Sequence, residues 1–579
     1  MALAGCMLAG ASLLRGKELA AIGHASPVEV MGSVRTKILA ELAAARKVKK
    51  EEPAPSPWAT DGTLTYTDGT PAEGVVVTDG TTCVVTDEQG KYSFERDSTA
   101  RFVYYTVPAH CQVPTHSATD LTACFYLAAK KGRSTYDFTL TRLPGGVEKD
   151  YRMIVIGDPQ VTNSANPYYE SPDDNPVTKS DIARFTDETM VDIRRTIAQW
   201  PDSMPVYGLS MGDDVQYYGG YNAQLERQIR TALGSSRMRL FSVIGNHDQD
   251  GSALYKRKWE DSWGPTDYSF DRGNDHYICL NNVQFTRKKS YYSPGELTEK
   301  QMHWLKRDLA LTPKHKKVIL CYHIPFTFGC SPSSKAQPLP LAAEGGHYSS
   351  ARLSELLQLL SQFSEGGYEL FCGHTHFAIN HEIDFAGQHI MEHCHAAACG
   401  NIWQSNINLC GTPNGYYVYA MAEGNISDCY YKGTFWEKSR QMTLFSASTN
   451  FYDESYAADW NLPADRNVII ANVFNVDSRW TVTAIADGIE YPMHRIVSRG
   501  QDAFATSYHH KYCKAMTYQF VGKQNGYLLM NHLFYFEPQR ADAEITVRAR
   551  DPYGHVYEAK SSEAISEPFF NFAHYYSTR

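Results

Sequence analysis

The sequence lacks the features that define several protein classes. Its residues are 43% hydrophobic and 21% charged, which is ordinary globular usage, so the chain is neither disordered nor a coiled coil. Lys and Arg number 55 against 64 Asp and Glu, a formal net charge of −9. Binding to a phosphate backbone requires clustered cations, so we expect no nucleic-acid binding. Beyond its first residues, no apolar run approaches the roughly 18 residues that span a bilayer.

Cysteines are few for the length of the chain and do not form a recognisable framework. The 579 residues contain 13 cysteines and no C-x-x-C pair, so neither a disulfide scaffold nor a zinc ribbon is expected. Cys279, Cys321 and Cys372 lie inside apolar runs, which predicts small buried side chains. Cysteine usage does not indicate a cellular compartment.

The N-terminal segment, residues 1–57, has two interpretations. Met1–Leu14 is apolar and small, and Leu3-Ala4-Gly5-Cys6 resembles a bacterial lipobox, in which the cysteine carries a lipid anchor. Only five residues precede Cys6, so either the true start lies upstream or the match is a coincidence. A helical pattern over residues 28–50 and a proline-rich linker, EEPAPSPW, follow.

Three further domains are expected, at residues 58–146, 150–437 and 440–579. The first has short Val-, Thr- and Tyr-rich runs between turn dipeptides such as Asp68-Gly69 and Asp79-Gly80. It resembles transthyretin-like or carboxypeptidase-regulatory-like β-sandwiches and carries no catalytic constellation. The last returns to alternating strands, in RNVIIANVFNVDSRWTVTAI and AEITVRARDPYGHVYEA, each of which predicts a strand pair in an antiparallel sandwich.

In the central domain, apolar β-branched runs alternate with helical patterns. This alternation predicts a sheet covered on both faces by helices. Thr298 heads a capping-box pattern with Gln301, and Ser180 precedes Asp181 at another predicted helix start.

Five of the apolar strands in this domain end in a short polar signature. Loops at the carboxyl ends of strands meet at one edge of an α/β sheet, where ligands bind, and the glycines would let the backbone turn sharply there. Carboxylates, imidazoles and carboxamides without thiolates suit divalent Mn, Mg, Fe, Zn or Ni. The signatures are Gly157-Asp158-Pro159-Gln160, Gly212-Asp213-Asp214, Gly245-Asn246-His247-Asp248, His323, and Gly373-His374-Thr375-His376.

This ordered set resembles the calcineurin-like metallophosphoesterases. The resemblance implies an α/β (α+β) fold, with a central four-layer metallophosphoesterase β-sandwich flanked by helices and an all-β sandwich domain at each end. Together with CGNIWQSNINLCGTPNGYYVY and NVFNVDSRWTV, the chain is similar to a three-domain type found in exported proteins of Bacteroidetes. That likeness implies an exported location, in the periplasm or at the cell surface.

The resemblance also implies a ligand set for two divalent metal ions, with Mn favoured. One metal would be held by Asp158, Gln160 and His376, and the other by Asn246, His323 and His374, with Asp213 bridging both. His247 would donate a proton or a hydrogen bond to the leaving group, with Asp248 orienting it.

The sequence departs from common members of the superfamily at two positions. Gln160 stands where many have His, and this harder ligand favours Mn or Mg over iron. Gln216 stands three residues after Asp213, where purple acid phosphatases carry a tyrosine, so a ferric-tyrosinate centre is not expected; Tyr217 has that spacing only from Asp214.

Two further residues are candidates for substrate contact, His393 in EHCHAAACG and Trp403, each of which also fits a packing role. Isolated histidines such as His276 are expected to be surface or hydrogen-bonded core residues.

The function implied is hydrolysis of a phosphomonoester or phosphodiester by attack of a metal-bridging hydroxide. The substrate would be a small-molecule, glycan-linked or lipid-linked phosphate ester. An exported binding or scaffold protein on an inactive phosphoesterase fold is the alternative, and metal content separates the two.

Overall fold

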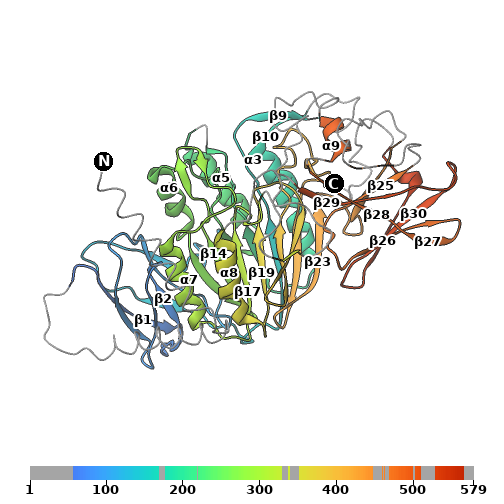
Figure 1. The fold of residues 1–579 in the computed structure, drawn as a ribbon. Helices are drawn as coiled ribbons and strands as arrows, with labels where there is room; N and C mark the ends of the chain where they lie inside the picture. Colours follow the sequence, from blue (N-terminus) through green and yellow to red (C-terminus); the bar gives the residue numbers. More distant parts are fainter. Residues whose placement is uncertain are drawn as a thin grey trace, which may run out of the picture.

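The computed structural model consists of three bodies arranged along the chain: a β module, a central core and a C-terminal β body (Figure 1). It describes residues 56–168, 177–217, 220–328, 337–338, 351–447, 460, 462, 468–499, 502–509 and 529–565. The predictions for Met1–Leu14, Cys6 and residues 28–50 lie outside the described residues.

The N-terminal module consists of two small sheets with the strand orders β4-β1-β7 and β3-β2-β5-β6. The predicted turns at Gly69 and Gly80 are confirmed, with φ of 84° and 85° that glycine adopts without strain. The strands are β1 (Ala59–Tyr66), β2 (Val76–Thr78), β3 (Cys83–Val85), β4 (Lys91–Glu95), β5 (Phe102–Tyr105), β6 (Tyr126–Ala128) and β7 (Phe138–Leu140).

The core is built on two mixed sheets. The first has the order β12-β11-β8-β22-β23, in which β8, β11 and β12 are parallel. Its strands are β8 (Asp150–Ile156), β11 (Val206–Ser210), β12 (Arg239–Ser242), β22 (Gly415–Ala422) and β23 (Asn425–Gly433).

The second sheet has the order β13-β14-β17-β19-β21-β20-β18, with β14, β17, β19 and β21 parallel. Its strands are β13 (Tyr268–Arg272), β14 (Asp275–Leu280), β17 (Lys317–Tyr322), β18 (Gln337–Pro338), β19 (Tyr368–Cys372), β20 (Ile379–Phe385) and β21 (Gln388–Cys394). Two hairpins stand apart from the sheets, β9 (Ala165–Tyr168) with β10 (Val177–Ser180), and β15 (Phe285–Arg287) with β16 (Ser290–Tyr291).

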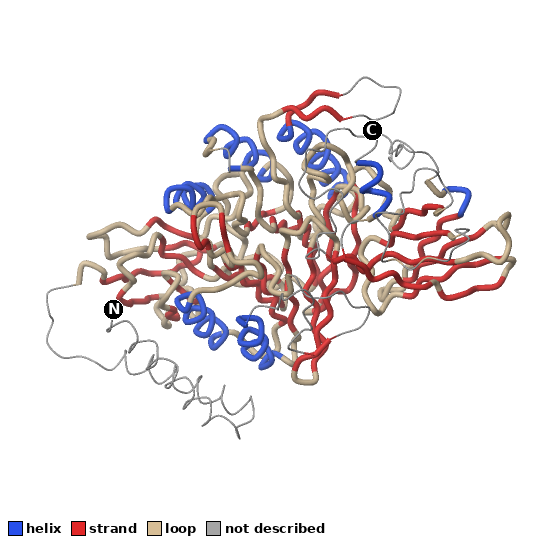
Figure 2. Tube along the Cα trace, turned by 45° about the horizontal axis from the view of Figure 1, so that its top comes forward, coloured by secondary structure: helices blue, strands red, loops and turns tan. Residues whose placement is uncertain are grey.

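Helices lie on two opposite sides of the strands (Figure 2). They are α3 (Asp181–Arg184), continued by a π-helical turn into α4 (Met190–Ala198), α5 (Ala223–Gly234), α6 (Ala253–Trp263), α7 (Glu299–Leu311), α8 (Ala351–Leu360) and α9 (Ala503–Tyr508), the last in the C-terminal body. The predicted helix starts are confirmed: Ser180 caps α3, and Thr298 and Gln301 form a capping box at α7. None of the helices in these described ranges combines the length and apolar character needed to cross a bilayer.

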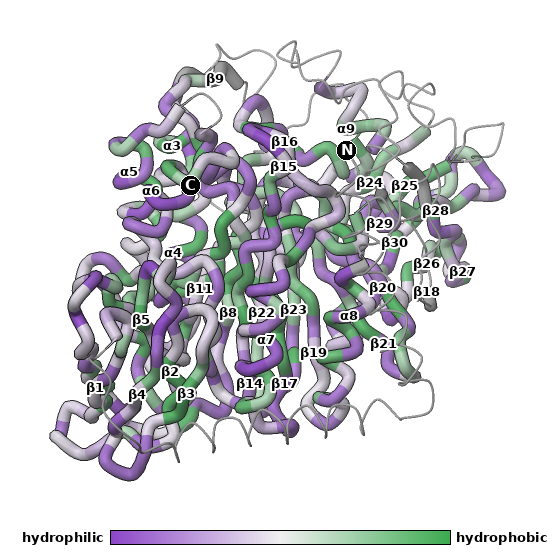
Figure 3. The backbone as a smooth tube through the Cα atoms, turned by 60° about the vertical axis from the view of Figure 1, so that its left-hand side comes forward, coloured by the Kyte–Doolittle hydropathy of each residue, from purple (hydrophilic) through white to green (hydrophobic). Residues whose placement is uncertain are grey.

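The prediction of one sheet with helices on both faces is wrong, because the core has two sheets and one face of the first packs against the second. Along β8, Met153 and Val155 belong to a different apolar cluster from Ile154 and Ile156, so both faces of the strand are buried. One face packs against helices and the other against the second sheet. A continuous apolar strand indicates that both of its faces are covered. It does not reveal whether a helix or a second sheet covers each face. The resulting β-sandwich with outer helices is the four-layer fold expected from the resemblance, and its strands are mainly hydrophobic (Figure 3).

The C-terminal body has two antiparallel sheets, β24-β25-β29-β28 and β27-β26-β30-β31. The predicted pair β30 and β31 is confirmed, but β25 and β26 lie in different sheets, because the polar segment between them crosses the sandwich. The strands are β24 (Met442–Ser446), β25 (Ile469–Val473), β26 (Thr481–Ala486), β27 (Ile489–Pro492), β28 (His494–Arg499), β29 (Leu529–Phe536), β30 (Ile545–Arg550) and β31 (Val556–Lys560).

Candidate metal centre

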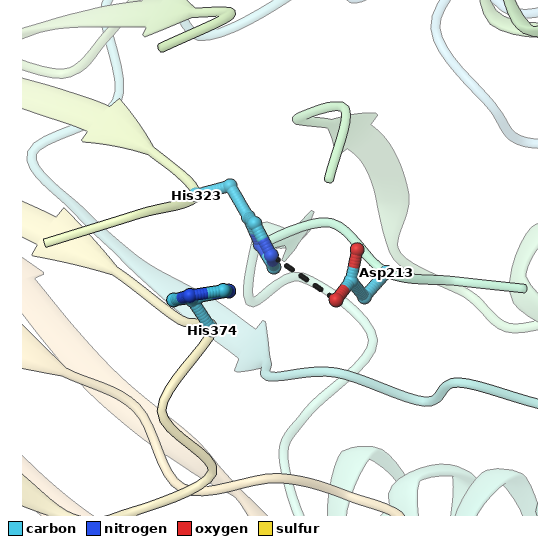
Figure 4. A group of neighbouring side chains, drawn as sticks. All are labelled: Asp213, His323 and His374. Atoms are coloured by element: carbon cyan, nitrogen blue, oxygen red, sulfur yellow. Dashed lines mark ion pairs between the residues drawn. The ribbon is translucent and has the colours of Figure 1, made fainter. Parts of the chain in front are cut away.

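Three of the predicted ligands meet at the carboxyl edge of the two sheets. The ligand atoms of Asp213, His323 and His374 all lie within 4.8 Å of one another. They follow β11, β17 and β19, so they come from both sheets, and their side chains converge in Figure 4. The Nε2 atom of His323 is 3.1 Å from a carboxylate oxygen of Asp213.

The other predicted ligands surround this group. The Nε2 atom of His323 lies 3.1 Å from Oδ1 of Asn246, and 4.0 Å from Oδ1 of Asp158. The Nε2 atom of His376 lies 3.7 Å from the same Asp158 oxygen. Gln160 is buried in the loop that follows β8.

The backbone at the site adopts an unusual conformation at the predicted ligands themselves. Five of them have positive φ, between 39° and 70°, a backbone region that residues other than glycine rarely adopt. Such strain persists only where the surrounding structure enforces it, and it is concentrated at functional sites. The five are Asp158, Gln160, Asp213, His374 and His376.

Two of the neighbouring glycines serve a different purpose from the sharp turn that we expected of them. A Cβ on Gly245 would lie 2.1 Å from Oδ1 of Asp213, and one on Gly373 would lie 2.7 Å from Oδ2 of Asp158. Glycine is needed at both positions because a carboxylate occupies the space of the side chain.

Burial sets the protonation of several ligands. It raises the pKa of the Asp158 carboxyl well above its usual range, and it lowers the pKa of His376 to about 4. Burial also opposes charge on the neighbouring pair, His323 and Asp213, but the opposite charges and hydrogen bonds around each of them together outweigh it. These interactions raise the pKa of His323 to about 10 and hold the pKa of Asp213 below its usual range. A bound cation would take the place of the His323 proton in this pair.

The orientation of His323 is fixed by groups that the sequence analysis did not single out. Its Nδ1 lies 2.8 Å from the carbonyl oxygen of Met211, which can only accept, so Nδ1 carries a proton and Nε2 faces the ligands. The buried Asn282 side chain accepts hydrogen bonds from the backbone N–H groups of His323 and Ile324. Asn282 follows β14, and no motif in the sequence marked it.

The ring of His247 is held by Gln216 and not by Asp248. Its Nδ1 is 2.7 Å from Oε1 of Gln216. The Asp248 carboxylate instead accepts hydrogen bonds from three backbone N–H groups, those of Asp213, Val215 and Gly245. The orienting role expected of Asp248 therefore falls to Gln216, while Asp248 fixes the loops that carry Asp213 and Asn246.

Trp403 does not reach a substrate surface. Its side chain is fully buried, and its indole Nε1 donates a hydrogen bond of 2.8 Å to the carbonyl oxygen of Pro159. The buried Arg184 guanidinium lies over the indole ring and donates to the Trp403 carbonyl oxygen at 2.6 Å. Trp403 braces the loop between Asp158 and Gln160, which is a positioning role.

His393 also lies away from the ligands. It is buried in β21, with Nδ1 2.7 Å from Oδ1 of Asn380 and Nε2 3.5 Å from a Glu369 oxygen. Each ring nitrogen of His393 therefore has a partner within the protein, so the structure does not support a substrate contact. Tyr217 likewise points into the core, where its hydroxyl donates to Glu226.

The residues present fit divalent cations. Oε1 of Gln160 is buried and has no hydrogen-bond partner among the described residues, a state that costs on the order of 1–3 kcal/mol unless a ligand satisfies it. The same edge presents two carboxylates, a second carboxamide, His323, and two histidines whose pKa values burial lowers, His374 and His376. This is a set of nitrogen and oxygen donors suited to Mn, Mg, Fe or Zn.

Comparison with protein families identifies this arrangement. The family model for calcineurin-like phosphoesterase matches residues 151–378, which contain all seven predicted ligands. The chain belongs to the calcineurin-like phosphoesterase family. Models for the N-terminal and C-terminal parts of calcineurin-like phosphoesterase match residues 59–143 and 392–557, so all three bodies of this phosphoesterase follow the family's three-part architecture. Members of the family typically depend on two metal ions.

Curated relatives cover only part of this phosphoesterase. The 3',5'-cyclic adenosine monophosphate phosphodiesterases CpdA of Escherichia coli K12 and O157:H7 are each 31% identical over 159 residues, or 28% of this chain. The chain spans about half the length of these relatives, 50% in each case. Among solved structures, phosphopantetheinyl hydrolase (PptH) from Mycobacterium tuberculosis matches 43% of this chain and 91% of its own, at 10% identity and a TM-score of 0.22.

Proposed function

We propose that this phosphoesterase hydrolyses a phosphomonoester or phosphodiester with two divalent cations at the carboxyl edge of its sheets. The observation that supports this most is the convergence of Asp213, His323 and His374 from three strands of two sheets. Five ligand candidates have a strained backbone conformation, which supports a binding site over a scaffold role, because strain without a ligand would only destabilise the fold.

One cation would be held by Asp158, Gln160 and His376, and the other by Asn246, His323 and His374, with Asp213 shared. When bound, such cations supply positive charge at the phosphoryl oxygens and lower the pKa of the attacking water. Mn is favoured, since the carboxylates and carboxamides are hard oxygen ligands; Mg, Zn, Fe and Ni are the other candidates.

His247 would assist the leaving group from outside the ligand set. Oε1 of Gln216 can only accept, so the adjacent Nδ1 carries a proton. The ring can then donate from Nε2 only as an imidazolium. Burial lowers the pKa of His247, whereas the Asp213 charge opposes that effect, and a bound phosphate ester would add further negative charge.

The exported location and the substrate follow from resemblance alone and stay predictions. Because the Escherichia coli relatives are named as cyclic-nucleotide phosphodiesterases, cyclic AMP belongs in a substrate screen with Mn present. Phosphomonoesters, linear diesters, phospholipids and phosphoglycans complete that screen.

The variant His247→Asn tests the mechanism. It should keep both metals and lose about 10²–10⁴ in rate on an alkyl ester, the range for general acid assistance. An activated aryl ester should lose little, because nitrophenolate departs without a proton. Equal losses on the two esters, or loss of a metal, would contradict the role given to His247.

A further inference from the structure

A pocket of about 510 Å³ lies where the N-terminal module meets the core. The module contributes the Asp79–Gly80 turn and the segment from Thr99 to Phe102. The two bodies are joined beside it: the hydroxyl groups of Thr106 and Ser269 lie 2.9 Å apart, and Val107 forms a β-bridge with Phe270. The module therefore forms a wall of this pocket.

The core side of the pocket lies at the same edge as the metal centre. Asn281 and Gln284 follow the end of β14, which runs parallel to β17, and His323 follows the end of β17. Gln249 and Gly251 belong to the loop between β12 and α6, which also carries Asn246 and His247. One loop thus carries both a wall of the pocket and the proposed proton donor.

Ring contacts connect the pocket to the ligands. Phe285 lines the pocket and packs edge-on against Tyr291, with ring centroids 5.9 Å apart. Tyr291 packs edge-on against His374, with centroids 5.7 Å apart. The hairpin that carries both aromatic residues is tied to the His247 loop, because the Lys289 N–H donates to the Asp250 carbonyl oxygen at 3.0 Å. The pocket is therefore two ring contacts from a ligand.

Three cations and three carboxylates line the pocket. Of the cations, Arg101 pairs with Glu260 at 2.9 Å and with Asp261 at 2.5 Å, Lys300 pairs with Asp97 at 2.8 Å, and Lys256 is the third. Because the carboxylates of Asp79, Glu260 and Asp267 balance these charges, the lining has no excess of positive charge to favour a second phosphate. This polar lining also makes the pocket a poor site for an acyl chain.

The uncharged polar groups of the lining are carboxamides and hydroxyls. The side-chain nitrogens of Gln249 and Gln284 donate hydrogen bonds to the carbonyl oxygens of Gly245 and Asn281, respectively. Their side-chain oxygens accept no hydrogen bond from any described residue. Thr99, Ser252 and the half-buried ring of Phe285 also line this surface. Hydroxyl-rich ligands, which offer donors beside acceptors and an apolar C–H face, match such a lining.

We propose that this pocket binds the alcohol part of the ester, and that this part is a sugar or polyol. The inference rests on the proposed function, since it assigns the leaving group of that reaction. It gives the N-terminal module a role in substrate selection.

The test fills the pocket from the module side with Ala100→Trp, and uses Ala118→Trp, an exposed module position outside the pocket, as the matched control. The full chain with Mn is assayed on glucose 6-phosphate and ethyl phosphate, and on the corresponding methyl diesters. Ala100→Trp should lower kcat/KM on the sugar ester about tenfold, the equivalent of 1.4 kcal/mol, and change the ethyl ester less than twofold. Equal changes on the two esters would overturn the proposal.

Binding without turnover separates this inference from the proposed function. Ligand-observed NMR with methyl glucoside, methyl mannoside, methyl N-acetylglucosaminide and inositol should show binding to wild type and to Ala118→Trp, and none to Ala100→Trp. Binding of none of these probes to wild type would overturn the pocket assignment. Absence of hydrolysis of any ester would overturn the proposed function but leave the NMR result to decide the pocket.

Discussion

The indole of Trp403 donates a hydrogen bond to the carbonyl oxygen of Pro159, the residue between two proposed metal ligands. Asp158 and Gln160 both have positive φ, so the backbone between them needs support. The buried Trp403 supplies it from a segment more than two hundred residues away in the chain. A substitution that removes only this hydrogen bond should therefore act on metal binding.

Trp403→Phe should weaken metal binding about tenfold or more, the usual effect of removing a partner that holds a ligand in place. Metal titration monitored by calorimetry measures the change. Trp304→Phe is the matched control, because Trp304 is equally buried but its Nε1 has no hydrogen-bond partner among the described residues. Equal metal affinities in the two variants would contradict the bracing role.

Substitutions of Gln216 and Asp248 should affect different properties, the first kcat and the second metal content. Gln216→Ala removes the hydrogen bond at Nδ1 of His247, so kcat on an alkyl ester should fall by about tenfold to a hundredfold, within the range of acid assistance, at unchanged metal content. Asp248→Asn would place an amide nitrogen against a backbone N–H of the Asp213 or Gly245 loop, so metal content should fall. Elemental analysis beside steady-state kinetics checks both, and unchanged metal in Asp248→Asn would refute its role in fixing the loops.

A buried histidine far from the ligands should make stability depend on pH. His276 lies between Asp271 and Asp308, at 2.7 and 2.8 Å, as a hydrogen-bonded core residue. Burial lowers the pKa of His276, but the two carboxylates outweigh it and raise the pKa to about 9. The folded state therefore holds this proton more tightly than the unfolded chain, whose histidine titrates near 6.5. The added stability is complete below about pH 6.5 and is lost as the pH rises through about 9.

Thermal unfolding of wild type and His276→Gln measures this contribution. The wild type should be the more stable by up to about 3 kcal/mol at pH 6, and the difference should shrink toward pH 10. His389→Gln, at a half-exposed position on β21, is the control. A difference in stability between His276→Gln and wild type that does not change with pH would show that His276 is not protonated in the fold.

The order of the polar signatures predicts the fold class through the family resemblance that it carries, and it predicts the edge at which the polar side chains meet. Apolar strands that each end in Gly-Asp, Gly-Asn-His-Asp or Gly-His-Thr-His deliver their side chains to one edge whichever sheet they belong to. The same patterns do not reveal that β8, β11 and β12 form one sheet and β17 and β19 another. A strand buried on both faces has the same apolar sequence pattern whether a helix or a second sheet covers it.

The supporting residues were harder to predict, because their roles depend on contacts between distant segments. The sequence marks Gln216 only as a position that is not tyrosine, and no motif marks Asn282. Each acts through hydrogen bonds that sequence spacing does not reveal. The sequence makes Trp403 and His393 candidates for substrate contact and leaves a packing role open for each. Burial gives both of them packing roles. The boundaries predicted between the domains stay a prediction.

The most direct test of the two-metal account is metal stoichiometry in the full chain after incubation with Mn, measured beside turnover of a phosphate ester. Wild type should hold two metals per chain, and Asp213→Asn and His374→Ala should each hold fewer and lose turnover, because Asp213 and His374 lie with His323 at the centre of the proposed site. Wild-type rate at full occupancy in either variant, or no metal in wild type, would contradict the account.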